Sequence, residues 1–189
     1  MKKNKRFKGM VVALLMMTII SSGFTFADTE NIGAAAASVD SSYTLEDMLI
    51  YAIQDEYLAR AEYEAIIEAF DVERPFSNIM KSEETHIALL TPLFEAYGYE
   101  MPTDTSGEYT HLPSTLAETF AIGVEAEINN IAMYEKFLSQ DLPEDVRDVF
   151  ERLMNASENH LKAFERGAAR PTASSGNQRG GNSARFGRR

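Results

Sequence analysis

The chain has 189 residues, of which 29 are acidic and 18 basic, and a formal net charge of −11 at pH 7. So acidic a chain repels nucleic acid and anionic membranes, which excludes nucleic acid as a partner and leaves cations as the favoured one. The sequence contains no cysteine, so disulfide bonds, thiolate catalysis and iron–sulfur clusters are also excluded.

Residues 1–27 are predicted to be a secretory signal peptide. They begin with MKKNKRFK, which has five basic residues and no acid, continue with the apolar run MVVALLMMTII, and end in small residues before a cleavage site after Ala27. The apolar run is shorter than the about 20 residues that span a membrane, so no stable anchor is expected after cleavage. The mature protein is therefore expected in an extracellular, cell-wall or periplasmic location.

Residues 28–43 are small and polar and are predicted to be a flexible lead. A first helix is predicted from Thr44, an N-cap candidate in TLED, to about residue 71, because its apolar residues recur at helical spacing. A second helix is predicted from Pro75 to Gly98, a C-cap candidate. Residues 98–114 are rich in turn residues and form the long connection to the next helix.

A third helix is predicted from Thr115, in the candidate capping box TLAE, until QDLPED interrupts its pattern. A fourth begins near Pro143 and runs to about residue 166. Residues 168–189 are a Gly/Ser/Arg-rich tail, predicted to be disordered, with contact to an anionic cell-surface polymer as its functional alternative. The chain is therefore predicted to be all-α, with a four-helix bundle over residues 44–167 and a long crossover between its second and third helices.

Polar residues interrupt each of the four apolar stripes near its middle. A buried, unpaired carboxylate is costly, and several carboxylates in one core repel one another unless a cation neutralises them. The interruptions therefore predict a metal site, held by oxygen and nitrogen ligands. The candidate ligands are Glu56 in the first stripe, Glu83 and His86 in the second, Glu127 in the third, and His160, preceded by Ser157, in the fourth.

This constellation resembles the ferritin-like di-metal carboxylate bundles, in which two helices supply one Glu each and two supply E-x-x-H. The pattern departs at Ser157, which stands where the fourth carboxylate is expected. The segments DEYLARAEY, FSNIMKSEETHIALLTPLFEAYG and ASENHLKAFER are similar to an uncharacterised ferritin-like family, domain of unknown function 2202. The resemblance covers about residues 44–166, and members of that family are similar in having serine at the position of Ser157.

The resemblance implies a two-metal centre in which Glu83 bridges two ions or serves the first. Glu56 and Glu127 would be terminal carboxylates, and His86 and His160 would hold one ion each. Oxygen-rich ligation with two imidazoles suits iron or manganese, with zinc chemically permissible.

The leading hypothesis is an exported metal-binding protein that oxidises Fe(II) or consumes peroxide. Open positions beside Ser157 would accept water, dioxygen or peroxide, and Tyr63 or Tyr134 would lie near them. Whether the protein is an enzyme, of ferroxidase or peroxidase type, stays open, as does pairing of two bundles into a homodimer.

The main alternative is a non-catalytic cell-surface bundle with a binding or structural role and a paired polar core. In that interpretation Glu83 pairs with protonated His86, and Glu127 pairs with His160.

Other residues bear on these alternatives. Arg60 could pair with Glu56 at (i, i+4) and weaken its claim as a ligand. Because Ser157 removes one carboxylate from the expected ligand set, a site for a single metal ion is a third hypothesis. Glu62 and Glu125 fall off the apolar stripes and are predicted to lie on solvated faces.

Overall fold

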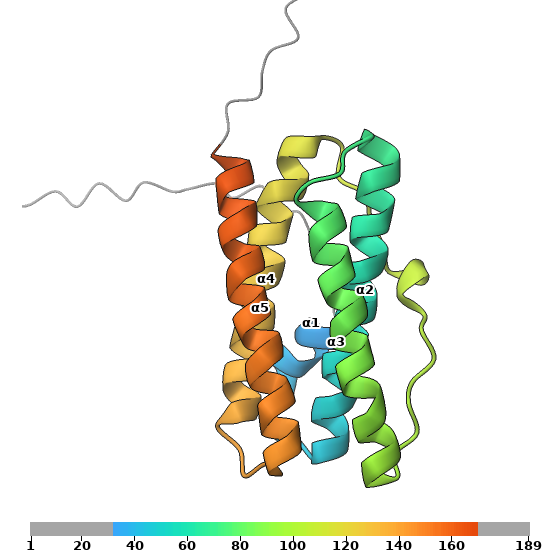
Figure 1. Cartoon of the computed structure of the whole chain (residues 1–189), viewed down its shortest axis with the longest axis vertical. Helices are drawn as coiled ribbons and strands as arrows, with labels where there is room; N and C mark the ends of the chain where they lie inside the picture. Colours follow the sequence, from blue (N-terminus) through green and yellow to red (C-terminus); the bar gives the residue numbers. More distant parts are fainter. Residues whose placement is uncertain (1–31, 170–189) are drawn as a thin grey trace, which may run out of the picture.

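The computed structural model describes residues 32–169, and the described residues form five α-helices and one short 3-10 helix, without a strand. Four long helices lie side by side along the long axis of the molecule (Figure 1). The described chain is therefore all-α, and its arrangement is consistent with the expected bundle. The long helices are α2 (Leu45–Phe70), α3 (Phe76–Tyr97), α4 (Leu116–Leu138) and α5 (Glu144–Ala168).

Capping boxes fix the starts of α2 and α4. The Thr44 side chain accepts a hydrogen bond from the Asp47 N–H, and the Asp47 carboxylate accepts one from the Thr44 N–H. Thr115 and Glu118 repeat this exchange at the start of α4. Each box satisfies two backbone donors that the helix itself leaves unpaired. The N-terminal signals TLED and TLAE are thus confirmed as helix starts.

Two apolar clusters occupy the core, one on either side of a layer of buried polar residues. On α3, for example, Phe76 and Ile79 belong to one cluster, Leu90 and Phe94 belong to the other, and Glu83 lies between them. Helix α5 passes in the same way from one cluster to the other. The interruptions of the four stripes therefore meet at one level of the molecule, here called the polar layer, with residues Glu56, Glu83, His86, Glu127, Ser157 and His160.

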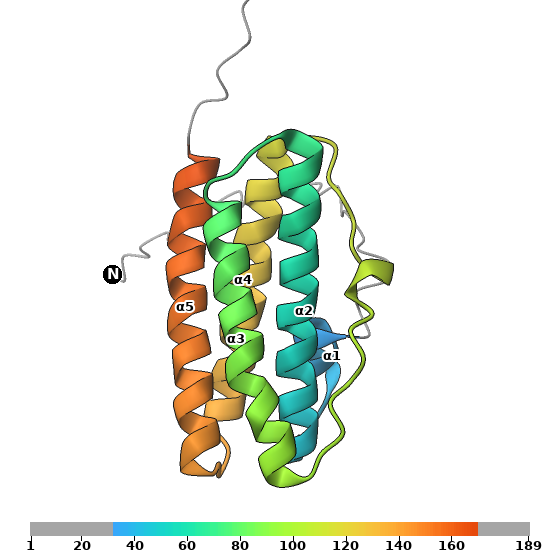
Figure 2. The same ribbon diagram turned by 45° about the vertical axis from the view of Figure 1, so that its right-hand side comes forward.

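A fifth helix, α1 (Gly33–Val39), lies within residues 28–43, where the sequence predicted a flexible lead. It packs against α2 and α4, and Figure 2 shows it beside α2. Ala34 and Ala37 are buried in this contact. The prediction of a flexible lead was wrong here. The segment GAAAASV contributes mainly alanine methyl groups to the core, and consecutive alanines do not produce the alternation of large apolar and polar residues by which a helix is recognised in a sequence.

The long connection runs along the outside of α2 and includes the 3-10 helix η2 (Ser106–Glu108) (Figure 2). Arg60 of α2 forms an ion pair with Asp104 of this connection. The expected alternative, a pair between Arg60 and Glu56, is therefore wrong. Instead, Arg60 ties the connection to the helix that carries Glu56.

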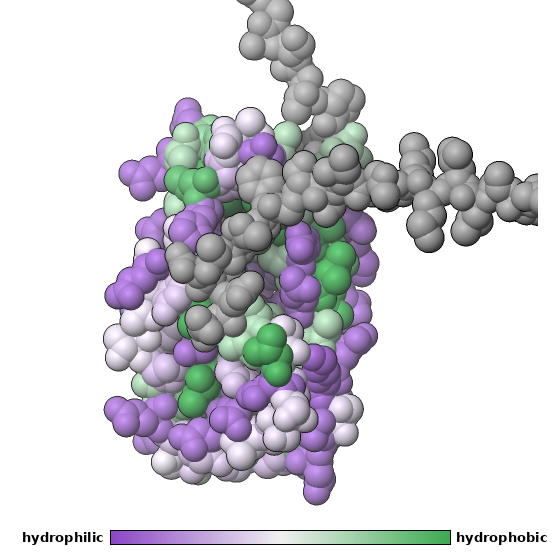
Figure 3. Space-filling view, turned by 180° about the vertical axis from the view of Figure 1, so that it is seen from behind, coloured by the Kyte–Doolittle hydropathy of each residue, from purple (hydrophilic) through white to green (hydrophobic). Residues whose placement is uncertain are grey.

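Exposed apolar side chains are scattered over the described surface. The large exposed ones among the described residues are Val39, Met101, Leu112 and Ile128, and on the face shown in Figure 3 apolar residues are mixed with hydrophilic ones, which is normal for a folded domain. No helix of residues 32–169 has the length and apolar character needed to cross a bilayer. The signal-peptide prediction for residues 1–27 lies outside the described residues, and so does the tail prediction for 168–189 except for residues 168 and 169, which end α5.

The backbone of Gly33 generates a prediction about the docking of α1. Gly33 has φ +59°, and a Cβ at this position would approach Asp55 Oδ1 to 2.5 Å. Gly33→Ala should therefore lower the free energy of unfolding by about 1–2 kcal/mol, measured by urea denaturation. Gly107→Ala is the matched control, because a Cβ there meets nothing within 4 Å. Equal stability of the two variants would contradict the docked position of α1.

Candidate metal centre

The structure brings the five predicted ligands together in the polar layer. They come from all four long helices, and none of them is more than 8% exposed. Among them are three carboxylates and two imidazoles, and the described structure places no lysine or arginine in ion-pair contact with any of these carboxylates. Charge in this layer is therefore balanced only by protons or by a bound cation.

The first half of the layer is built around His86. Its Nδ1 lies 2.7 Å from Glu83 Oε2 and 2.9 Å from Glu56 Oε2. The (i, i+3) spacing on α3 puts His86 and Glu83 on one face of that helix. Ser82 Oγ lies 3.1 Å from the other ring nitrogen, Nε2. Glu56 completes its contacts by accepting a 2.8 Å hydrogen bond from the Tyr134 hydroxyl.

The second half of the layer is built around His160 and is less complete. Its Nδ1 lies 3.2 Å from Glu83 Oε1 and 3.4 Å from Glu127 Oε1, yet this buried nitrogen has no hydrogen-bond partner among the described residues. Glu127 Oε1 accepts a 3.2 Å hydrogen bond from the Tyr63 hydroxyl. Glu83 thus presents one oxygen to each histidine and lies between the two halves.

The two halves are related in their supporting hydrogen bonds as well. Tyr63 of α2 donates to Glu127 of α4, and Tyr134 of α4 donates to Glu56 of α2. Each tyrosine lies seven residues, about two helical turns, beyond the glutamate of its own helix. Both tyrosines lie near the site, as expected from the sequence. Because each of the helices α2 and α4 donates one tyrosine hydrogen bond to a glutamate of the other, the polar layer has an approximate twofold pattern.

Burial and hydrogen bonding compete in setting the pKa values of the first half. It raises the pKa of Glu83 well above its usual value, and the neighbouring charge of Glu56 adds to this effect. Burial acts in the same direction on Glu56, but hydrogen bonding and attraction to His86 outweigh it and lower the pKa of Glu56. Burial opposes the charge on His86, yet hydrogen bonds to Glu56 and Glu83 raise the pKa of His86 to about 10. In the metal-free chain a cation would therefore have protons to displace.

Ser157, in place of a fourth carboxylate, is hydrogen-bonded away from the cluster. Its hydroxyl donates to Asn130 Oδ1 at 2.8 Å, and the Asn130 amide donates in turn to the Asp55 carboxylate. Asp55 Oδ1 also accepts a 2.7 Å hydrogen bond from the Ala34 N–H of α1. Burial raises the pKa of Asp55 to about 7. The position of Ser157 is thus linked through Asn130 to the docking of α1.

Sequence reasoning missed Asn130, Asp55 and Glu62. Asn130 follows Glu127 by three residues, a spacing that could have placed it on the buried face of α4. Asp55 directly precedes Glu56 and carried no periodic signal. Glu62 was predicted to be solvated, but it is half-buried in a pocket beside α1, and burial raises its pKa to about 8.

Fold and site together define an all-helical protein whose buried glutamates and histidines could hold metal in two groups. The groups are Glu56 with Glu83 and His86, and Glu83 with Glu127 and His160, and within each group the ligand atoms lie within 4.8 Å of one another.

Comparison with known sequences places this chain in a family. Residues 46–174 match the profile of the family described as an uncharacterized protein domain, DUF2202, and the chain belongs to this family. The resemblance stated from the sequence is thereby confirmed at the level of the family.

One relative of this chain also has a solved structure. The chain is 31% identical over 133 residues to the uncharacterized protein MJ0754 of Methanocaldococcus jannaschii, a match covering 62% of this chain and 71% of that protein. It is also similar to the crystal structure of hypothetical protein MJ0754 from Methanococcus jannaschii. That match has a TM-score of 0.61 and 27% identity, and it covers 68% of this chain and 83% of that chain.

The raised pKa of His86 generates a prediction for the metal-free chain. The favourable pairing of its imidazolium contributes stability that is fully present below the unfolded pKa of about 6.5 and is lost as the pH rises through about 10. Urea denaturation between pH 6 and pH 11 should show this loss, and His86→Gln should abolish it. His111→Gln is the matched control, because it makes the same substitution at an exposed histidine outside the site. A His86→Gln curve parallel to the wild-type curve would contradict the assignment.

Proposed function

We propose that this protein is a ferritin-like metalloprotein that binds two metal ions in the polar layer. The observation that carries the proposal is His160 Nδ1, which is buried between two carboxylates and has no hydrogen-bond partner among the described residues. Buried polar atoms are nearly always partnered, so such an atom needs an explanation. A metal ion bound to this nitrogen, Glu83 and Glu127 supplies the missing partner.

The two oxygens of Glu83 support a pair of ions over a single one. One oxygen faces His86 and the other faces His160. Under the proposal Glu56 and His86 hold one ion, Glu127 and His160 hold the other, and Glu83 serves both. Carboxylates with imidazoles suit iron or manganese and permit zinc.

The surrounding residues prepare this site for a reactive ion. The hydroxyls of Tyr63 and Tyr134 hold Glu127 and Glu56 in orientation, in the manner of the hydrogen-bonded outer groups of metal sites. The apolar clusters on both sides of the layer exclude water. Iron or manganese bound here would supply one-electron redox chemistry, and the proposed activity is oxidation of Fe(II) or consumption of peroxide. The proposed location outside the cytoplasm rests on the sequence pattern of residues 1–27.

Metal content tests the proposal. Protein stripped of metal and then offered Fe(II), Mn(II) and Zn(II) should bind about two ions per chain, measured by elemental mass spectrometry. The double variant Glu83→Ala/His86→Ala should lose this metal, because it removes the shared carboxylate and one imidazole. Glu84→Ala/His111→Ala is the matched control, since it removes the same two residue types from exposed positions. Equal metal content in both double variants would refute the site.

A second candidate function is a metal-free structural or binding bundle, and the short contacts of His86 with Glu56 and Glu83 favour it. The two candidates differ in the response of thermal stability to metal. A specific ion at 100 times its dissociation constant should stabilise the fold by about 2.7 kcal/mol per independent site, seen as a higher melting temperature by calorimetry. The alternative with a paired polar core predicts that added Fe(II), Mn(II) or Zn(II) leaves the melting temperature unchanged.

A further inference from the structure

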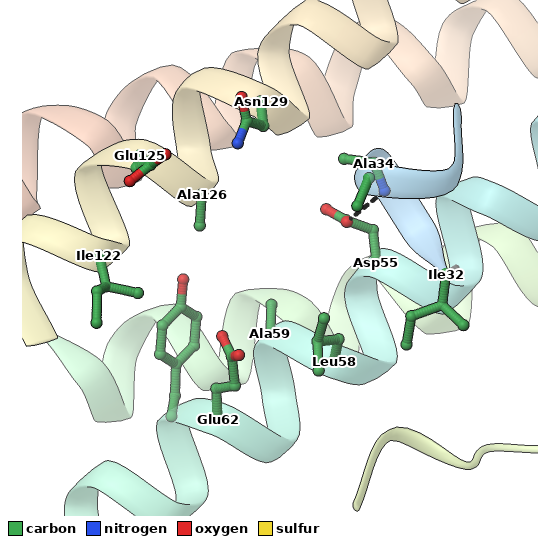
Figure 4. A pocket seen from close by; sticks show the side chains of 12 residues that line it. Ile32, Ala34, Asp55, Leu58, Ala59, Glu62, Ile122, Glu125, Ala126 and Asn129 are labelled. Carbon is green, nitrogen blue, oxygen red and sulfur yellow. Dashed lines mark hydrogen bonds between the residues drawn. The ribbon is translucent and has the colours of Figure 1, made fainter. Parts of the chain in front are cut away.

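A pocket opens on the side of the molecule where α1 lies between α2 and α4 (Figure 4). Its volume is about 130 Å³, several times the about 10–15 Å³ that one water molecule needs. The small side chains of Ala59 and Ala126 leave this space open between the two long helices. The proposed metal ions and their ligands lie deeper, in the polar layer.

The carboxyl groups that line the pocket have no basic residue among them. Asp55 and Glu62 of α2 and Glu125 of α4 contribute carboxyl groups, the Asn129 side chain adds an amide, and no lysine or arginine is among the lining residues. Figure 4 shows Asp55 and Glu62 on one side of the space and Glu125 with Asn129 on the other. A concave surface of one sign raises the local concentration of ions of the opposite sign. Such a pocket favours a cation over dioxygen or an anion.

Two polar contacts lead from this pocket to the polar layer. Tyr63 lines the pocket, is 3% exposed, and donates its hydroxyl hydrogen bond to Glu127. A single side chain therefore touches both the pocket and a candidate metal ligand. Asp55, also in the lining, is linked through Asn130 to Ser157. The two contacts reach the half of the layer where His160 Nδ1 has no hydrogen-bond partner in the described part of the chain and where Ser157 stands in place of a fourth carboxylate.

We propose that this pocket is the entrance through which a divalent metal ion reaches the polar layer, with Tyr63 as its inner wall. The inference deepens the proposed function and rests on it. The acidic lining attracts the hydrated ion from solvent, and the ion passes Tyr63 to reach Glu127 and His160. Entry from this side explains why carboxyl groups that bind nothing in the polar layer are gathered beside it.

The rate of metal uptake tests the entrance separately from the site. Co(II), whose absorbance changes on binding, is mixed with metal-free protein in a stopped-flow instrument, and the final stoichiometry is measured on the same samples. Ala126→Trp should fill the pocket and slow uptake at least about tenfold, while the number of ions bound at equilibrium stays that of the wild type. Ala121→Trp is the matched control, because Ala121 is exposed on the same helix and does not line the pocket.

A second pair of variants tests the charge of the lining without adding bulk. Glu62→Gln/Glu125→Gln should slow uptake and weaken its dependence on ionic strength, because it removes the carboxylate of Glu125 and the ionisable carboxyl group of Glu62, whose pKa is about 8. Glu64→Gln/Glu68→Gln makes the same two substitutions at exposed positions of α2 outside the pocket and should have a much smaller effect.

The outcomes separate the two proposals. Slower uptake in both pocket variants with unchanged stoichiometry supports the entrance. Uptake as fast as in the wild type, in chains that still bind the same number of ions, overturns the entrance and leaves the metal centre standing. A wild-type chain that binds no Co(II), Fe(II) or Mn(II) removes the metal centre, and the entrance with it.

Discussion

The burial of Glu83 is the constraint on which the rest of the structure depends. This carboxylate is 3% exposed at the middle of α3, and burial alone favours its neutral form. One of its oxygens lies 2.7 Å from His86 Nδ1 of α3 and the other lies 3.2 Å from His160 Nδ1 of α5, so α3 and α5 must meet at one level. The remaining carboxylates come from α2 and α4. Apolar clusters on both sides then fix the level, because a helix shifted by one turn would bury a charge among phenylalanines.

The sequence predicted the helical body and the polar layer for the same physical reason. A glutamate or histidine that interrupts an apolar stripe in helical register has to be buried, and Glu56, Glu83, His86, Glu127 and His160 all stand in register. Helix α1 was missed because its buried face consists mainly of alanine. A pattern of apolar and polar residues does not distinguish an alanine-rich helix from a flexible segment of small residues. The pairing of Ser157 with Asn130, and the half-buried position of Glu62, depend on where α1 lies, so a one-dimensional pattern could not give them.

The approximate twofold pattern of the layer is broken at one position, and this bears on function. Tyr63 with Glu127 mirrors Tyr134 with Glu56, but nothing on α5 mirrors Glu83. Ser157 donates its hydroxyl hydrogen bond to Asn130 instead, and His160 Nδ1 has no hydrogen-bond partner within residues 32–169. The half to which α5 contributes a serine in place of a carboxylate is also the half that the acidic pocket reaches. An ion entering there would meet the side of the layer where Ser157 stands in place of a carboxylate, which suits exchange of ions.

The most direct test is a crystal structure of the manganese-loaded protein with anomalous diffraction recorded at the manganese edge. The account predicts two anomalous peaks within the polar layer, one on the His86 side of Glu83 and one on the His160 side. A single peak between the histidines would replace the two-metal centre by a mononuclear one. A map without anomalous peaks in this layer would contradict the claim that Glu83 is buried there to hold metal.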